Sequence, residues 1–301
     1  MSLAGLSLRD LEYLVAVAEN LHFGRAARSC AVSQPALSAQ IRKLEAFLGL
    51  TVFERIPGRV MVTERGVGVI EGAHTVLTAA RMLLDAAREH QEPLAGPFHL
   101  GVIPTLGPYL LPLALRSQRD AFPAMQVMIS EGRTADIEQQ LRLGTLDALL
   151  ACLPQDDPAF QSHPLFYEPF LLMHPTDHEP TWPLCPLDHG LMLLEEGHCM
   201  RDQVNGHCSV FPPGARRHAA GLEMLRHMVA AGEGLSLVPA LAARTLGSMD
   251  GLVAYTPVAD AAVGRQVALV ARRTDPRTGH LAKLAALLRK IVPPPAQPLA
   301  A

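Results

Sequence analysis

Two cysteines in one polar segment are the residues most able to do chemistry. Cys199 and Cys208 lie with eight residues between them in the run EEGHCMRDQVNGHC at 195–208. A cysteine reacts as its thiolate, and His198 and Arg201 could supply positive charge or hydrogen-bond donors beside Cys199. Peroxide would oxidise such a thiolate to a sulfenic acid, which a second thiol converts to a disulfide. A disulfide needs Cα atoms within ~7 Å, so bonding two distant sulfurs would force local refolding.

Three other roles remain open for this segment. Two buried cysteines can simply pack as small apolar side chains, although the polar surroundings argue against this. The His-Cys pairs at 198–199 and 207–208 offer zinc-type ligands, but adjacent side chains point apart and the spacing matches no common zinc site, so we predict no metal. A nucleophilic enzyme such as a thiol peroxidase would use the same Cys and His, yet no third, orienting group is identifiable. No cofactor is predicted.

Composition limits the class of protein. The 301 residues fit two or three domains, and 49% apolar residues suffice for sizeable cores. No apolar run approaches the roughly 18 residues that span a bilayer, and acidic residues interrupt the early apolar stretch, so neither a membrane protein nor a secreted one is expected. The five cysteines, an odd number, are expected to be free thiols of a cytoplasmic chain. Cys30 is expected to pack in a core, whereas Cys152 and Cys185 carry no motif.

The first 66 residues predict a winged helix-turn-helix. Apolar residues recur at helical spacing from residue 8, a short Ala-rich helix follows at 22–30, and a third helix runs over 33–48. Ser33 is a good N-cap for this third helix, Pro35 suits its first turn, and Gly49 ends it. A β-hairpin with a turn at 56–59 follows. The polar face of the third helix and the hairpin carry the candidate DNA contacts, which are Ser33, Gln34, Pro35, Ser38, Arg42, Arg55 and Arg59.

The rest of the chain predicts a long helix and an α/β domain. Residues 65–90 place Val69, Ala73, Val76, Ala80, Leu83 and Ala87 on a heptad seam, which favours a helical dimer interface. The stretch 91–97 breaks the helix with Pro and Gly. From residue 98, strand-like runs alternate with helical patterns. Strands are expected at 98–103, 125–130, 146–152, 165–173, 191–195, 234–238, 252–256 and 264–271, and helices at 108–121, 134–143 and 221–231.

The N-terminal residues resemble a known family. The runs FGRAAR at 23–28, VSQPALSAQIRKLE at 32–45 and TERG at 63–66 are similar to the DNA-binding domain of LysR-type transcriptional regulators. The resemblance implies an all-α winged helix-turn-helix at 1–66, a dimerising linker helix and hinge at 67–97, and a regulatory domain at 98–301. That domain would be built like a periplasmic binding protein, with two subdomains and crossovers near 168–172 and 266–270.

Further runs are similar to the peroxide-sensing members of this family. They are LRDLEYLVA at 8–16, GVIPTLGPYLLP at 101–112, GHCMRDQ at 197–203 and MVAAGEGLSLVPA at 228–240. The resemblance implies a peroxidatic Cys199 and a resolving Cys208. It implies that Thr105, Thr134, His198, Arg201, Asp202 and Arg265 surround the peroxide. His207 and Pro212-Pro213 depart from the family pattern.

The resemblance therefore predicts a transcription regulator of oxidative-stress genes, not an enzyme. Its partners would be double-stranded promoter DNA, hydrogen peroxide, RNA polymerase and further copies of itself, paired as a dimer of dimers. The principal alternative is a LysR-type regulator that binds a small organic ligand in the cleft. Thr105, at a strand-to-helix junction, is where a ligand carboxylate could meet helix N–H groups.

Overall fold

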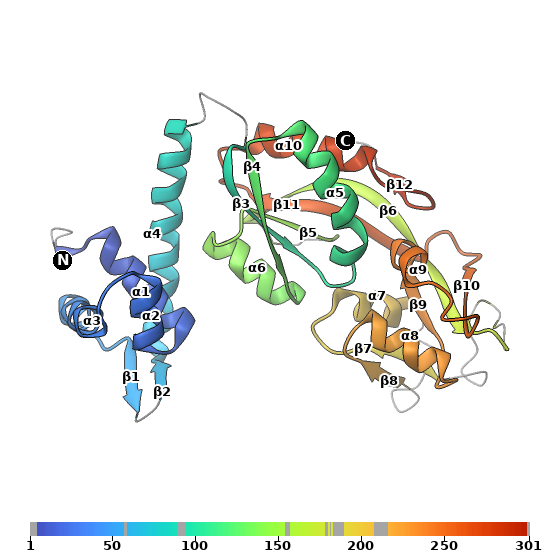
Figure 1. Cartoon of the computed structure of the whole chain (residues 1–301), viewed down its shortest axis with the longest axis horizontal. Coiled ribbons are helices and arrows are strands. Elements are labelled where there is room, and N and C mark those ends of the chain that lie inside the picture. Colours follow the sequence, from blue (N-terminus) through green and yellow to red (C-terminus); the bar gives the residue numbers. More distant parts are fainter. Residues whose placement is uncertain are drawn as a thin grey trace. The chain divides into compact units, whose positions relative to one another are not determined.

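The structure is a computed structural model that describes residues 5–56, 59–88, 94–153, 157–177, 180, 182, 190–207 and 216–299. The chain folds into two compact units. The first comprises Met1–His90 with Leu143–Thr145, and the second comprises Gln91–Arg142 with Leu146–Ala301. Each unit has hydrophobic packing of its own. Figure 1 shows the helices and strands of both units.

The N-terminal unit is a three-helix module followed by a hairpin and a long helix. Its elements are α1 (Leu8–Asn20), α2 (Phe23–Ser29), α3 (Gln34–Leu48), β1 (Phe53–Ile56), β2 (Arg59–Val62) and α4 (Glu64–Arg88). As predicted, the Ser33 hydroxyl caps α3 by accepting from the Ala36 N–H, and Gly49 ends the helix with φ 70°. Glu45 then accepts from the N–H groups of Val52 and Phe53, which fixes the start of the hairpin.

One apolar stripe of α3 packs the three helices together. Leu37, Ile41 and Leu44 are buried in this unit's core against α1 and α2, whereas the other face of α3 stays exposed. Helix α4 contributes Ala73 and Leu77 to the same core. Only part of the predicted heptad seam is therefore available for a dimer interface, since Ala73 is used internally while Leu83 is 73% exposed.

The second unit is built on one extended sheet. Its strand order is β10-β6-β11-β5-β3-β4, with β9 and β12 also paired to β6. Strands β3, β4 and β5 are parallel, and β11 runs antiparallel to β5 and β6. The strands are β3 (Gly96–Val102), β4 (Met125–Glu131), β5 (Ala148–Cys152), β6 (Phe160–Pro175), β9 (Ser236–Pro239), β10 (Val253–Pro257), β11 (Gly264–Arg272) and β12 (Gln297–Pro298).

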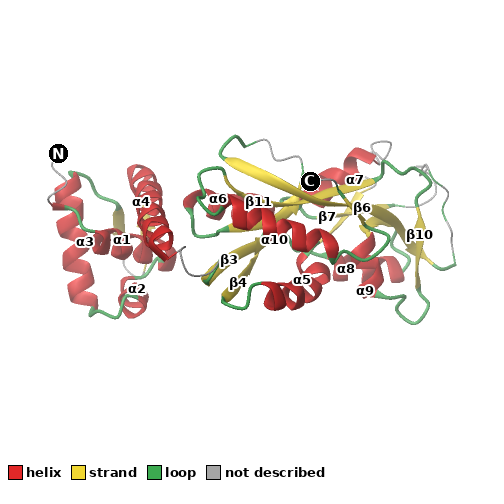
Figure 2. Cartoon of the chain, turned by 90° about the horizontal axis from the view of Figure 1, so that it is seen from above, coloured by secondary structure: helices red, strands yellow, loops and turns green. Residues whose placement is uncertain are grey.

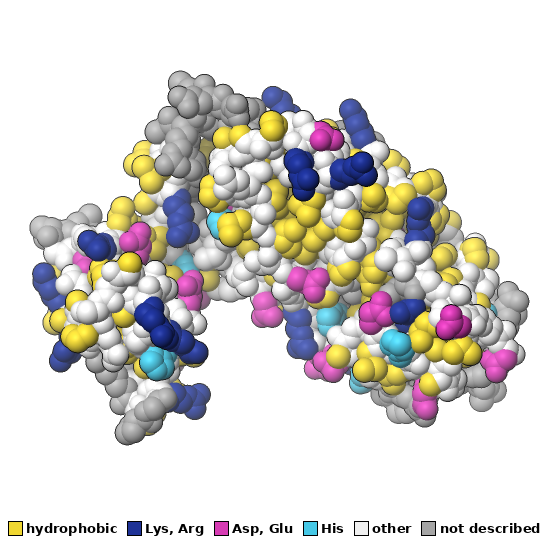
Figure 3. All heavy atoms as spheres, in the orientation of Figure 1, with side chains coloured by type: hydrophobic (Ala, Val, Ile, Leu, Met, Phe, Trp, Pro, Cys, Tyr) yellow, Lys and Arg dark blue, Asp and Glu magenta, His cyan; other side chains and the backbone are white. Residues whose placement is uncertain are grey.

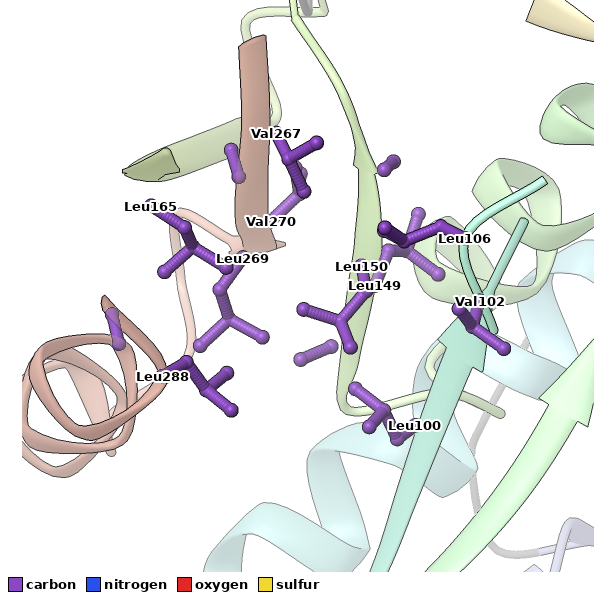
Figure 4. Packing of buried hydrophobic residues seen from close by; sticks show 14 of the residues in the cluster. Leu100, Val102, Leu106, Leu149, Leu150, Leu165, Val267, Leu269, Val270 and Leu288 are labelled. Carbon is purple, nitrogen blue, oxygen red and sulfur yellow. The ribbon is translucent and has the colours of Figure 1, made fainter. Parts of the chain in front are cut away.

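Helices α5 (Gly107–Ala121) and α10 (Thr278–Lys290) pack together over one part of this sheet, and α6 (Thr134–Leu143) lies on its other face (Figures 1 and 2). Strand β5 is buried at every position, as expected for a strand covered on both faces. Figure 4 shows Leu149 and Leu150 of β5 between Leu100 of β3 and Leu269 of β11. These residues form the first core of the unit.

Strand β6 leads from the first core to a second one. Phe166 packs in the first core, whereas Phe170 and Leu172 pack in the second. The chain returns between Val263, in the second core, and Val267, in the first. The second core is completed by α7 (Cys199–His207), α8 (Leu222–Ala230), α9 (Ala240–Leu246) and a parallel pair of strands, β7 (Leu191–Leu194) and β8 (Arg216–Ala219).

The predicted α/β fold is confirmed, and its details differ where the sequence signal was weak. Strand β6 runs over Phe160–Pro175 and extends beyond both ends of the expected strand at 165–173. Helix α7 was not expected, because only Met200 and Val204 of its residues are buried and its pattern is mostly polar. No helix in the described part of the chain is long and apolar enough to cross a membrane.

Candidate functional site

Cys199 is the first residue of α7 and lies where the two cores of the second unit meet. Gly197, with φ 92°, turns the chain into the helix in a conformation that favours glycine. The neighbouring Met200 is buried in the second core, whereas Cys199 packs against the first. A thiolate at this position gains from the positive end of the helix dipole.

A second thiol, to which no sequence motif gives a role, contacts Cys199. Cys152 is the last residue of β5 and is 6% exposed. A side-chain hydrogen bond joins the two thiols, and Gln203 of α7 forms a further side-chain hydrogen bond with Cys152. No sequence pattern relates residues 152 and 199, because the contact depends on how β5 and α7 pack.

One basic group acts on both sulfurs. Arg265, at the start of β11, is buried, and its positive charge favours the thiolate form of Cys152 and of Cys199. Its guanidinium is held by Glu168, whose Oε2 accepts from Nε at 2.8 Å, and by Thr105. The Thr105 hydroxyl accepts from Nη1 at 2.8 Å and its carbonyl accepts from Nη2 at 2.9 Å. Glu168 in turn accepts from the N–H of Leu241.

The two thiols share one proton. Their hydrogen bond lowers the pKa of Cys152 to about 6, and Arg265 and Gln203 contribute to this lowering against the opposing effect of burial. The same hydrogen bond, together with burial and the negative charge on Cys152, raises the pKa of Cys199. Like charges in contact cannot both form cheaply, so the pair loses one proton readily and retains the second.

Two buried oxygens beside the thiols have no hydrogen-bonding oxygen or nitrogen among the described residues. Thr134 Oγ1, at the N-terminus of α6, is buried without a hydrogen-bonding oxygen or nitrogen, and it lowers the pKa of the Cys199 thiol. Gln203 Oε1 is also buried and unpaired. Buried polar atoms are nearly always hydrogen-bonded, so these oxygens mark a place suited to a small polar molecule.

The structure brings together only some of the predicted site residues. Thr105, Thr134 and Arg265 gather at the thiols. Arg201 instead donates to the Leu194 carbonyl at 3.1 Å and lies 3.6 Å from the Glu196 carboxylate, and Asp202 is exposed. His198 is buried, and burial with the nearby charge of Arg133 lowers its pKa.

Among the described residues, the positive charge that acts on both sulfurs is that of Arg265. A buried His198 with a lowered pKa is neutral near pH 7, and the Arg201 guanidinium is committed to other partners. Arg201 follows Cys199 on the same helix, and a helix directs successive side chains to different sides.

Cys208 and Cys185 lie outside the described residues, as does the Pro212-Pro213 pair. Cys30 packs at the edge of the N-terminal core, as expected.

The described residues contain no group of three or more His, Cys, Asp or Glu that could hold a metal ion.

Most of the predicted DNA-contacting residues lie on the surface of the N-terminal unit. Ser33, Gln34, Pro35 and Arg42 are exposed and Ser38 is half-buried. Gln34, Ser38 and Arg59 line a groove between α3 and the hairpin. Arg55 belongs to β1, and its side chain lies outside the described part of the structure. On the face drawn in Figure 3, several Lys and Arg side chains surround this helical module.

These two folded units define a bacterial DNA-binding regulator. Residues 8–67 match the family model of the bacterial regulatory helix-turn-helix protein, lysR family, and residues 91–292 match the LysR substrate binding domain. The chain belongs to the LysR family of transcriptional regulators, as its sequence predicted.

Several relatives of the chain are named as OxyR or as hydrogen peroxide-inducible activators. The chain is 42% identical to the DNA-binding transcriptional dual regulator OxyR of Escherichia coli K12, over 94% of this chain and 95% of the relative. It is 37% identical to a probable hydrogen peroxide-inducible genes activator of Streptomyces viridosporus, covering 94% of both. A full-length OxyR variant from Pseudomonas aeruginosa has a TM-score of 0.77 at 35% identity, with 94% of this chain and 95% of that chain covered.

A further solved relative has hydrogen peroxide bound. It is a hydrogen-peroxide-bound cysteine-to-serine mutant of Corynebacterium glutamicum OxyR, with a TM-score of 0.64 and 30% identity over 95% of this chain and 92% of that chain.

Proposed function

We propose that this LysR-type regulator senses hydrogen peroxide through Cys199 and changes its action at promoter DNA when that residue is oxidised. The observation that carries the proposal is the position of the Cys199 sulfur. It lies at a helix N-terminus, within the field of Arg265, and it forms a side-chain hydrogen bond with Thr134. The similarity to OxyR proteins over nearly the whole chain supports the same function.

The site has the groups that the first oxidation step needs. The reaction proceeds when the shared proton lies on Cys152. The Cys199 thiolate then attacks one peroxide oxygen, an S–O bond forms and the O–O bond breaks. The departing hydroxide takes a proton and leaves as water, so the thiolate becomes a sulfenic acid. Arg265 stabilises the negative charge on sulfur and, as it shifts, on the leaving oxygen, while the hydroxyls of Thr134 and Thr105 are suited to orient the peroxide.

The second step proposed is attack of the Cys208 thiol on this sulfenic acid, which forms an S–S bond and releases water. Helix α7 sets the mechanical consequence. From Cys199 to His207 it rises about 12 Å, so the next residue cannot approach Cys199 to within ~7 Å while the helix persists. A Cys199–Cys208 disulfide therefore requires α7 to unfold, which links a local oxidation to a change of structure.

We further propose a role for each part of the chain in DNA binding and in the assembly of several copies. The N-terminal unit binds duplex DNA at 1–66, α4 with the hinge at 67–97 pairs two copies, and 98–301 is the sensor. Exposed Leu83 and Leu84 on α4 support pairing through that helix. The working form is a tetramer, built as a dimer of dimers in the cytoplasm, that contacts RNA polymerase at its promoters.

Chemical labelling of the reduced full-length protein tests this function. After one equivalent of hydrogen peroxide, dimedone should label Cys199 in protein that carries both Cys152→Ser and Cys208→Ser, and DNase footprints of the unaltered protein should change. Cys199→Ser should abolish both responses, whereas Cys30→Ser, which alters a thiol in the other unit, should leave both intact. A folded Cys199→Ser protein whose DNase footprint still responds to peroxide would contradict the proposal.

A further inference from the structure

Cys152 has no part in the mechanism proposed above, yet it is the thiol in contact with the reacting sulfur. It ends β5 and packs in the first core, whereas Cys199 begins α7 of the second. A side-chain hydrogen bond already joins the two sulfurs, and neither cysteine forms a disulfide in the described part of the structure.

We infer that Cys152 is a second resolving thiol, which captures oxidised Cys199 as a Cys152–Cys199 disulfide between β5 and α7. The inference rests on the proposed peroxide reaction at Cys199. The Cys152 sulfur attacks the sulfenic sulfur of Cys199, so that an S–S bond forms and the S–O bond breaks. The departing hydroxide takes up a proton and leaves as water. In total the two thiols lose two electrons and two protons, and one peroxide becomes two waters.

The surroundings of Cys152 suit it to this attack. Arg265 and the side chain of Gln203 both stabilise negative charge on its sulfur, so it is available as a thiolate when Cys199 carries the shared proton. Oxidation of Cys199 removes its S–H and leaves an electrophilic sulfur facing that nucleophile. Cys152 is buried, at 6% exposure, so its own sulfur is shielded from reagents in solution.

The two disulfides have opposite mechanical consequences. Capture by Cys208 needs α7 to unfold, whereas capture by Cys152 uses a contact that exists with α7 folded. A Cys152–Cys199 bond would fasten the two cores of the sensor together in their present arrangement. Cys152 therefore competes with the switch, and its removal should increase the fraction of protein that refolds on oxidation.

Disulfide mapping of full-length Cys208→Ser protein tests this inference. After equimolar hydrogen peroxide and alkylation, digestion without reductant should yield a Cys152–Cys199 linked peptide, and both thiols should be lost from the alkylated pool. Amide exchange should show α7 still protected. In the chain that retains Cys208, Cys152→Ser should raise the yield of the Cys199–Cys208 peptide, and the control Cys30→Ser should not.

Three results would count against the inference, and they are distinguishable. Dimedone-labelled or sulfinic Cys199 beside a fully alkylatable Cys152 would show that peroxide reacts but Cys152 does not capture the product. An unreacted Cys199 in both the Cys208→Ser and the unaltered chain would remove the proposed function and this inference with it. Diamide treatment of Cys208→Ser then shows whether the pair can close at all, and its failure would count against the inference independently of peroxide.

Discussion

Glu168 and Arg265 form a completely buried ion pair at the passage between the two cores of the sensor. Their carboxylate and guanidinium lie 2.8 Å apart, and neither side chain is exposed to solvent. Glu168 belongs to β6, the strand that leads from the first core to the second, and Arg265 to β11, at the return. The cation that acts on the thiols is thus fixed by the strands that join the two halves of the domain.

Glu168→Gln should destabilise the sensor strongly. The substitution leaves a buried guanidinium without its counter-charge, and breaking one partner of such a pair costs roughly 3–5 kcal/mol. Urea unfolding of the full-length protein measures the change. Glu195→Gln is the matched control, because its pair with Arg133 at 3.2 Å is half-exposed and contributes at most about 1 kcal/mol. Equal, small losses in the two variants would contradict the role given to Glu168.

The shared proton of Cys152 and Cys199 predicts a thiolate at unusually low pH. The pKa of Cys152 is lowered from 9.0 to about 6, so its thiolate should persist as pH falls below 9 and be lost as pH falls through about 6. Ultraviolet titration of the reduced protein measures this midpoint. Cys152→Ser should remove the low-pH step, and Cys30→Ser should leave it unchanged. Absence of any thiolate below pH 8 in the unaltered chain would show that the pair does not share its proton in this way.

Arg265→Lys should slow the oxidation of Cys199 far more than Arg201→Lys. A lysine keeps the charge but cannot bridge Glu168 and Thr105 as the planar guanidinium does. Losing such a fixed donor costs about 10²–10³-fold in rate at comparable sites. Rapid-quench labelling with dimedone, in a background that carries both Cys152→Ser and Cys208→Ser, compares the two variants. A larger loss of rate for Arg201→Lys than for Arg265→Lys would show that Arg201, and not Arg265, is the cation that activates Cys199.

The sequence predicted those parts of the molecule whose signals are local. Ser33 and Gly49 mark the two ends of α3, because helix capping depends on the residue type at each end. The apolar stripe of α3 follows from the spacing of its apolar residues alone. The partnership of Cys152 with Cys199, and of Arg265 with Thr105, could not be found this way. Each joins residues from separate strands or helices, and neither set has a periodic pattern.

The long helix shows a different limit of sequence reasoning. A heptad seam indicates which side chains of α4 share a face, but not what covers that face. Ala73 packs inside the N-terminal unit, whereas Leu83 remains exposed. One part of an apolar seam can pack within its own chain while another part is left exposed for a second chain. The sequence alone does not show where one part ends and the other begins.

Arg59→Ala should weaken DNA binding without changing sequence preference. Arg59 is exposed on β2 beside the groove lined by Gln34 and Ser38, where it can reach a phosphate. Loss of one phosphate contact should reduce the salt dependence of binding by a slope of about 1 per protomer. Fluorescence anisotropy at several salt concentrations measures both quantities. Arg119→Ala, an exposed arginine of the other unit, should change neither, and an unaltered slope for Arg59→Ala would exclude the phosphate contact.

Leu83→Glu should separate paired chains while leaving each chain folded. Leu83 is 73% exposed on α4, so a charge there costs the isolated chain little. Within a helical pair it would bury an unpaired carboxylate, which association cannot compensate. Sedimentation should show the variant dissociating at concentrations where the unaltered protein remains associated, with the same far-ultraviolet dichroism. Leu252→Glu is the matched control, because Leu252 is 53% exposed in the other unit and has no place in the proposed helical pair. If both variants associate as the unaltered chain does, α4 is not the pairing surface.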